Sequence, residues 1–262
     1  MPRLAANLSY LFTELPLPER FGAAAKAGFE GVEILNPYEM SPEAIAEALA
    51  RHRLTQVLLN LPAGDPAKGE RGLAALPGRE ADFWASFERA LLYAQRTRCA
   101  RLHVLAGVPP RDCPRAAAEE TYIANLRRAA DRAAGDGITL QLEPLNSRDN
   151  PGYFISTTGE TLRLIERIDR ANVRLQLDLY HCQIMEGDLA THIRALSGRF
   201  SHVQIAGVPG RHEPDHGEIN YPYLLQLLDE TGYSGWVAAE YRPKAGTLKG
   251  LGWARPWGIE PA

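Results

Sequence analysis

Cysteine is scarce in this chain. Its 262 residues include three, Cys99, Cys113 and Cys182, at spacings that match no metal-binding pattern. The number is odd, and nothing at the N-terminus resembles a signal peptide, which argues against a secreted protein held together by disulfides. We therefore expect reduced thiols and a cytoplasmic location.

Long runs of apolar residues and of like charges are missing as well. No apolar stretch is long enough to cross a bilayer, so we expect no membrane span. The net charge is −3 without clusters of one sign, which argues against a nucleic-acid-binding surface. The hydrophobic share of 45% and the charged share of 23% are typical of a globular protein with a sizeable core. Composition and charge do not decide the oligomeric state, so a homo-oligomer is left open.

Short apolar runs alternate with amphipathic segments from one end of the chain to the other. The apolar runs start at Leu4, Gly31, Thr55, Arg101, Ile138, Val173, Ser201 and Trp236. Helix start signals lie between them: Ser41 precedes Pro42, and Thr157 or Thr158 can cap a later helix. Eight strands that alternate with helices, without a linker-like break, predict one α/β domain over residues 1–262, a (β/α)8 TIM barrel.

The chief rival to the barrel is a doubly wound open sheet. That fold normally carries a glycine-rich turn after its first strand, where a pyrophosphate binds. Here the first run is followed by "SYLFTELPLPERFG", which has nothing to cradle a phosphate. The barrel is therefore the predicted fold.

One connection is unusually long. It runs from Pro62 to Arg79, after the third predicted strand. Long loops without secondary structure of their own are uncommon in compact domains and often act as lids. An exposed insertion fits the composition equally well, so closure of the loop over residues 62–79 is left open.

Polar residues end four consecutive strands of the predicted barrel. In a barrel these ends converge on one mouth, where active sites lie. The last inward residues of strands five to eight are Glu143, Asp178, Gln204 and Glu240. Three carboxylates do not stay ionised side by side without a cation, and an all-oxygen set suits Mg²⁺ or Mn²⁺ better than zinc. The sequence thus predicts one divalent metal ion; the alternative is that arginines at the rim pair with these acids.

A second polar layer is expected just below this set. Gln141, Gln176 and His202 each lie two residues before one of the strand-end residues. Residues two apart share one face of a strand, so these three side chains should point inward as well. They could support the residues above them.

Further polar residues are candidates for contact with a substrate. His181 is expected in the loop above the sixth strand, where it could hydrogen-bond a substrate oxygen or simply lie at the surface. Arg211 is interpreted as an anion clamp, because a guanidinium binds a carboxylate bidentately. Asn7 and Asn60 end the first and third strands, where they either contact substrate or only hold loops. His103 lies within the fourth strand and is expected to be a satisfied core histidine.

Several stretches of the chain resemble the hydroxypyruvate isomerase family, within the xylose-isomerase-like barrels. The stretches are "NLPAGDPAKGERG", "PGRE", "EPLN", "LDLYH", "GEINY" and "GWVAAEY", in that order and over nearly the whole chain. The resemblance implies the barrel, a divalent metal ion, and Glu143 and Glu240 as the pair of proton-transfer residues. Related ketose 3-epimerases place a histidine on the metal at the position of Gln204. The glutamine resembles the hydroxypyruvate isomerase pattern.

The resemblance implies an isomerase that interconverts hydroxypyruvate and tartronate semialdehyde through an enediolate. The carboxylate of such a keto acid needs a cation, for which Arg211 is the first candidate, followed by Arg71, Lys68 and His181. A 2-oxo-tetronate isomerase or a ketose 3-epimerase could use the same site. A non-catalytic sugar-binding protein is a less favoured alternative.

Two further activities of barrel proteins fit the sequence poorly. A Schiff-base aldolase needs a lysine on a strand, but Lys26, Lys68, Lys244 and Lys249 all lie outside the predicted strands. A multi-zinc endonuclease is disfavoured because too few histidines end the strands and no basic patch is present.

Overall fold

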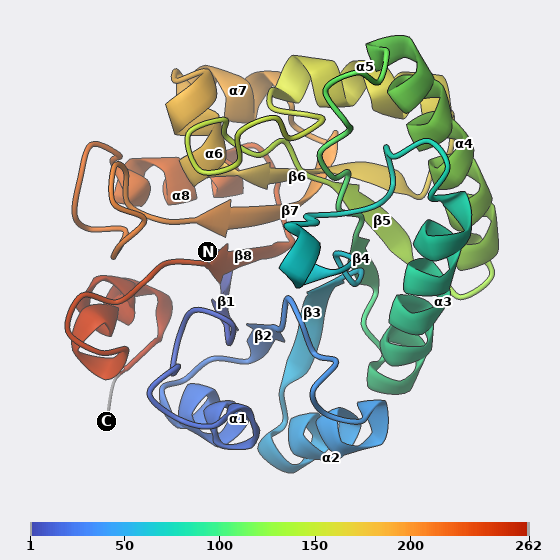
Figure 1. The fold of residues 1–262 in the computed structure, drawn as a ribbon. Helices are drawn as coiled ribbons and strands as arrows, with labels where there is room; N and C mark the ends of the chain where they lie inside the picture. Colours follow the sequence, from blue (N-terminus) through green and yellow to red (C-terminus); the bar gives the residue numbers. More distant parts are fainter. Residues whose placement is uncertain (1, 261–262) are drawn as a thin grey trace.

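The computed structural model describes residues 2–260, and within them eight parallel strands close into a barrel. Each strand pairs with its neighbour in the sequence, and the first pairs with the last, as Figure 1 shows. The strands are β1 (Arg3–Asn7), β2 (Gly31–Glu33), β3 (Thr55–Asn60), β4 (Arg101–His103), β5 (Thr139–Leu142), β6 (Val173–Asp178), β7 (Phe200–Ile205) and β8 (Trp236–Ala239). All eight predicted strands are confirmed, and the doubly wound sheet is ruled out.

Helices surround the barrel on its outer side (Figure 1). They are α1 (Leu17–Lys26), α2 (Pro42–His52), α3 (Glu80–Thr97), α4 (Arg115–Ala134), α5 (Thr158–Ile168), α6 (Leu179–Met185), α7 (Leu189–Ala195) and α8 (Tyr221–Glu230), with 3₁₀ segments η1 (Pro66–Lys68) and η2 (Leu248–Trp257). The predicted caps are present: the Ser41 hydroxyl accepts from the Ala44 amide at 3.2 Å, and Thr157 caps α5. No helix within residues 2–260 has the length and apolar character needed to span a membrane.

The hydrophobic core has two parts, because successive strand residues point to opposite faces. The larger part lies between strands and helices, and Leu4 and Ala6 of β1 belong to it. The smaller part consists of Ala5, Val57, Trp236 and Ala238, which lie inside the barrel. Trp236 is the first residue of β8. These side chains therefore fill the barrel toward the end where the strands begin and leave the opposite end for polar groups.

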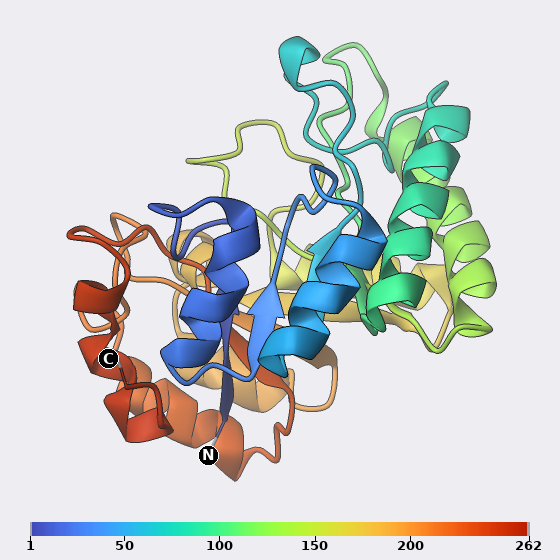
Figure 2. The same cartoon turned by 90° about the horizontal axis from the view of Figure 1, so that it is seen from below.

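The long connection after β3 is better structured than expected. It contains η1, and Gly72 forms an antiparallel bridge with Ala106 in the loop after β4. Figure 2 shows these two loops side by side, beyond the end of the barrel. Gly72 has a φ of +125°, and a Cβ there would lie 2.4 Å from the carbonyl oxygen of Leu105. Only glycine permits this close approach of two backbones.

Candidate active site

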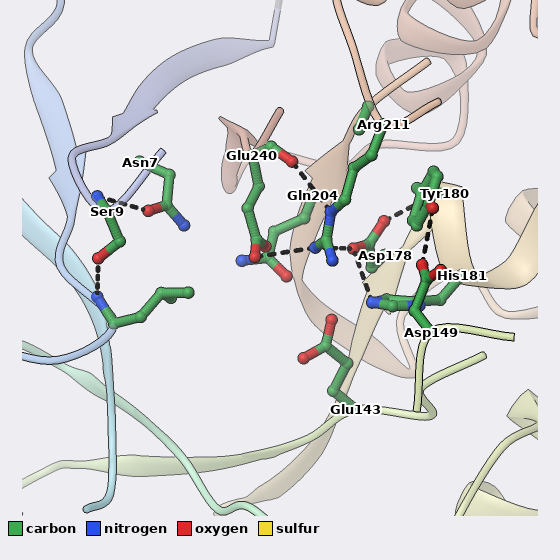
Figure 3. A network of polar contacts seen from close by, with 12 residues as sticks. Asn7, Ser9, Glu143, Asp149, Asp178, Tyr180, His181, Gln204, Arg211 and Glu240 are labelled. Carbon is green, nitrogen blue, oxygen red and sulfur yellow. Dashed lines mark hydrogen bonds and ion pairs between the residues drawn. The ribbon is translucent and has the colours of Figure 1, made fainter. Parts of the chain in front are cut away.

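The four predicted strand-end residues meet at one end of the barrel. Glu143 and Glu240 follow β5 and β8 directly, Asp178 ends β6, and Gln204 lies within β7. All four side chains are buried. Figure 3 shows Glu143 pointing toward the group that Asp178, Gln204 and Glu240 form with Arg211. The barrel therefore brings together the oxygen atoms that the sequence predicts as metal ligands.

Arg211 lies among these acids and not at an open rim. It comes from the loop between β7 and α8, and its Nη2 lies 2.9 Å from Oε1 of Glu240 and 3.5 Å from Oδ2 of Asp178. The guanidinium lies about equally far from the rings of Tyr10 and Tyr180, at 5.0 and 4.9 Å from their centroids. Burial opposes the charge, but Glu240 and Asp178 outweigh it and hold the pKa of Arg211 above its usual value. An arginine thus pairs with two of the three acids, Asp178 and Glu240, as the alternative to a metal ion predicted.

Within residues 2–260, Glu143 has no arginine or lysine in ion-pair distance. Its Oε2 lies 3.4 Å from Nε2 of His103, and its Oε1 is buried without a hydrogen bond. Burial lowers the pKa of His103 to about 3, so the imidazole is neutral and does not compensate a carboxylate. Burial, and then the charges of Glu240 and Asp178, raise the pKa of Glu143 well above its usual value. His103 is therefore part of the site. The prediction of a satisfied core histidine, made from its position within a strand, is wrong.

Glu240 experiences the same environment. Burial raises its pKa to about 8, with Asp178 contributing in the same direction and Arg211 in the opposite one. The guanidinium thus offsets only part of the cost of placing a second carboxylate in this site. An additional positive charge is needed before both glutamates ionise fully.

His181 lies in α6 and not in a loop, and it is buried. Its Nδ1 accepts a hydrogen bond from the backbone amide of Asn146 at 3.0 Å. Burial lowers the pKa of His181 to about 4, so the ring is neutral, and its single proton must sit on Nε2. Nε2 lies 3.6 Å from Oδ2 of Asp178. The ring therefore presents an N–H donor to the site.

The composition of the site suits a divalent cation. Ligand atoms of Glu143, Asp178 and His181 all lie within 4.8 Å of one another, so this buried group could hold a metal ion. Because the His181 Nε2 carries a proton, the carboxylates are the better ligands of the three. The unpartnered Oε1 of Glu143 is an oxygen that a hard cation would satisfy. The chemistry of the donor set therefore fits Mg²⁺ or Mn²⁺.

Glu33 is a site residue that the sequence patterns did not single out. It ends β2 and is fully buried. Its carboxylate accepts hydrogen bonds from Asn7 and Gln204 and contacts His202. Its neighbours Val32 and Ile34 both belong to the outer core, so strand alternation alone turns Glu33 inward. The alternation of inward and outward residues in "GVEIL" is the sequence signal that could have identified Glu33 as a site residue.

The expected lower layer is only partly as predicted. Gln176 donates to Oε1 of Gln204 at 2.6 Å, and His202 contacts Glu33, so both support the site. Gln141 instead exchanges hydrogen bonds with the Ser201 hydroxyl, at 2.8 and 3.1 Å. Gln141 therefore lies outside this network.

The remaining candidates for substrate contact already have partners within the protein, and their contact with a substrate stays a prediction. Asn60 pairs with Nδ1 of His103 at 3.1 Å. Lys68 is exposed and lies 3.8 Å from Asp65 within its own loop. Arg71 donates to the carbonyl of Asp149 and to the side chain of Asn150 in the loop after β5, both at 3.0 Å. Arg71 therefore links two loops at the mouth of the barrel.

A second group, away from the mouth, could also hold a metal ion and includes one of the cysteines. Cys182, Glu186 and His192 have ligand atoms within 4.8 Å of one another. Both carboxylate oxygens of Glu186 already accept from Thr158 at the start of α5, at 2.8 and 3.0 Å. This arrangement caps the helix without a metal ion.

The closed barrel and its buried acidic mouth define a TIM barrel with an enzyme-like site, and comparison with known proteins agrees. The family model described as "Xylose isomerase-like TIM barrel" matches residues 21–257, and the chain belongs to this family. A 2-oxo-tetronate isomerase of Cupriavidus necator is 50% identical over 98% of this chain and 99% of its own length. The hydroxypyruvate isomerase of Escherichia coli is 40% identical over 98% and 100%. Within the family, this chain is an aldose–ketose type isomerase of the hydroxypyruvate isomerase and 2-oxo-tetronate isomerase group.

Solved structures share the fold. The crystal structure titled AP endonuclease, family 2, from Brucella melitensis has 53% sequence identity and a TM-score of 0.97, over 98% of this chain and 100% of that one. A D-psicose 3-epimerase of Clostridium cellulolyticum has 22% identity and a TM-score of 0.75, over 92% and 85%. At that identity the second likeness concerns the fold alone.

Proposed function

We propose that this protein isomerises a 2-oxo-tetronate, a four-carbon sugar acid with a ketone at carbon 2. The relatives named 2-oxo-tetronate isomerase are 46–50% identical to this chain, whereas those named hydroxypyruvate isomerase or putative hydroxypyruvate isomerase are 39–44% identical. This difference favours the four-carbon acid over hydroxypyruvate, the substrate that the sequence motifs suggested first. Hydroxypyruvate has the same first three carbons and remains the second candidate.

The observation that carries the proposed reaction is the placement of two buried glutamates on opposite sides of the mouth. Glu143 follows β5 and Glu240 follows β8, so a small ligand between them faces a carboxyl group on each side. In the proposed reaction one carboxylate removes the proton from carbon 3. The electrons of that C–H bond form a double bond between carbons 2 and 3, which gives an enediolate. The other carboxyl group then delivers a proton to carbon 2, the hydroxyl proton on oxygen 3 passes to oxygen 2, and the carbonyl ends on carbon 3.

A Mg²⁺ or Mn²⁺ ion held by Glu143, Asp178, Gln204 and Glu240 would supply Lewis-acid stabilisation of the negative charge that develops on the two substrate oxygens. The N–H donor of His181 suits one of those oxygens, and the guanidinium of Arg211 suits the substrate carboxylate. The His181 side chain is buried, and the Arg211 side chain is only 13% exposed. Charged hydrogen bonds are stronger in such a water-poor site than in bulk solvent.

The experiment is a comparison of kcat/KM for 2-oxo-tetronate and hydroxypyruvate with Mn²⁺ present. We expect the four-carbon acid to be preferred. Preference for hydroxypyruvate would return the assignment to the three-carbon acid, and turnover of neither, with a neutral ketose accepted, would favour an epimerase-type substrate. Binding of sugar acids without any turnover would favour the non-catalytic alternative.

We further infer that the endonuclease title of the Brucella structure does not describe this chain's reaction. The strand-end set consists of oxygen ligands, and the net charge of −3 does not suit a phosphate backbone. Incision of a duplex with an abasic site, measured on a gel beside the isomerase assay, tests this inference.

A further inference from the structure

Glu33 is a buried carboxylate to which the proposed reaction gives no role. Its Oε2 accepts hydrogen bonds from Nδ2 of Asn7 at 2.8 Å and from Nε2 of Gln204 at 2.9 Å. Its Oε1 contacts Nε2 of His202, and neither of these two side chains is exposed to solvent. A carboxylate is retained in such a place only when donors compensate its loss of water. Here three donors come from β1 and β7.

The contacts of Glu33 determine which way the amide of Gln204 points. The nitrogen of that amide donates to Oε2 of Glu33, because a carboxylate oxygen accepts hydrogen bonds. The oxygen of the same amide accepts from Nε2 of Gln176 at 2.6 Å. The Gln176 amide can itself turn either way, since its own oxygen has no partner among the described residues. The carboxylates of Glu33 and Glu240, which both accept a hydrogen bond from Gln204, therefore select the orientation, with the amide nitrogen toward β1 and β2 and its oxygen toward β6.

This orientation bears on cation binding. Gln176 lies two residues before Asp178 on the same face of β6. The amide oxygen of Gln204 is thus turned to the side of the mouth that carries Asp178, and it keeps a second lone pair. The reversed amide would present an NH₂ group there, which repels a cation.

We propose that Glu33 is a positioning residue, which locks the amide of Gln204 so that its oxygen faces the divalent cation. The proposal rests on the proposed function, in which that cation binds beside Gln204. Groups that orient a ligand without touching the metal typically change its affinity 10- to 100-fold. Glu33 would then act through Gln204 and not through its negative charge alone.

The test is a double-mutant cycle on Mn²⁺ affinity, measured from the electron paramagnetic resonance signal of free Mn²⁺, a readout that needs no turnover. Glu33→Gln keeps the shape of the side chain and should weaken Mn²⁺ binding about 10-fold or more. In the Gln204→Leu background, which has no amide to orient, the same change should cost less than about twofold. An equal loss in both backgrounds would show that Glu33 acts by charge, and no loss in the native background would remove it from the site.

A second variant covers the case in which Glu33→Gln does not fold. Glu33→Asp keeps the charge but withdraws the carboxylate from Gln204, so it should weaken Mn²⁺ binding if positioning matters and leave it unchanged if only charge matters. Glu213→Gln is the matched control, because Glu213 is equally a buried glutamate but accepts from the backbone amide of Lys244, at 2.9 Å. Circular dichroism confirms folding of each variant.

The outcomes separate this proposal from the proposed function. Native protein that binds no Mn²⁺ overturns the cation site and, with it, the role of Glu33. Native protein that binds Mn²⁺ while Glu33→Gln and Glu33→Asp bind it equally well overturns only the positioning role.

Discussion

The guanidinium of Arg211 lies 2.9 Å from the carboxylate of Glu240 inside the barrel mouth. Without this pair, the negative charges of Glu240 and Asp178 would face each other without compensation, because Asp178 relies on the same guanidinium at 3.5 Å. A substrate carboxylate that enters the mouth therefore meets an arginine that is already oriented. Little side-chain entropy is lost when such a residue binds its ligand.

Replacing Arg211 should affect acidic substrates selectively. We expect Arg211→Met to raise KM for 2-keto acids about 10- to 100-fold, which corresponds to one lost charged hydrogen-bond pair. KM for a neutral ketose should change little. Arg242→Met is the control, since Arg242 is exposed and its guanidinium lies 5.9 Å from the Tyr10 ring. Unchanged KM for keto acids in Arg211→Met would transfer the role to Arg71, Lys68 or His181.

Removal of metal should abolish turnover and lower thermal stability. Glu143 has no cationic partner in the described part of the chain, so a bound divalent ion stabilises the folded state that holds it. At 100 times its dissociation constant, such a ligand contributes about 2.7 kcal/mol, or roughly 5–10 °C in Tm for a chain of this size. Scanning calorimetry of chelated protein, with and without added Mn²⁺, measures the shift.

The Asp178→Asn variant serves as the control for metal removal. It loses a ligand charge, so added Mn²⁺ should raise its Tm much less than that of the native protein. Full turnover by protein shown to contain no metal would contradict the assignment of the cation site.

The contact between the loops after β3 and β4 should depend on Gly72. Gly72→Ala places a Cβ 2.4 Å from the Leu105 carbonyl oxygen at a φ of +125°, which costs about 1–3 kcal/mol in backbone strain alone. We expect faster proteolysis within residues 62–79 and reduced kcat. Gly78→Ala is the control: its φ of +82° is strained too, but nothing lies within 4 Å of the added Cβ. Equal proteolysis of both variants would mean that strain, and not the contact between the loops, decides.

The sequence predicted the barrel well because the decisive information is local. Each strand is a short apolar run and two helices have clear start signals, so Ser41 could be identified as a cap, and Thr157 or Thr158 as another, without knowing their surroundings. The strand-end residues followed, since parallel strands in a barrel must end at one mouth. The positions of Asp178 and Glu240 required no further information.

The partners within the mouth could not be predicted in the same way. Arg211 adopts a left-handed φ of 54° in a loop, and its contacts with Tyr10 and Tyr180 join residues far apart in the sequence. The proton position on His181 depends on the backbone amide of Asn146, in the loop after β5. Such contacts follow from tertiary packing, and no periodic pattern in the sequence reports them.

If Glu143 and Glu240 transfer protons, turnover in D₂O should place deuterium on carbon. A proton held by a carboxyl group can exchange with water before it is returned, whereas a hydride that moves directly between carbons cannot. We expect deuterium at carbon 2 of the product and in recovered substrate, measured by mass spectrometry and proton NMR.

Each glutamate should be needed for this exchange. Glu143→Gln and Glu240→Gln should lower kcat about 10²- to 10⁴-fold with Mn²⁺ restored, because each removes one acid–base group. Exchange of deuterium into recovered substrate should fall in both variants. Glu213→Gln, which removes a buried carboxylate whose partner is the backbone amide of Lys244, should keep both rates. Product without solvent deuterium, together with a glutamate variant that still turns over at the native rate, would exclude proton transfer through an enediolate and favour a direct hydride shift.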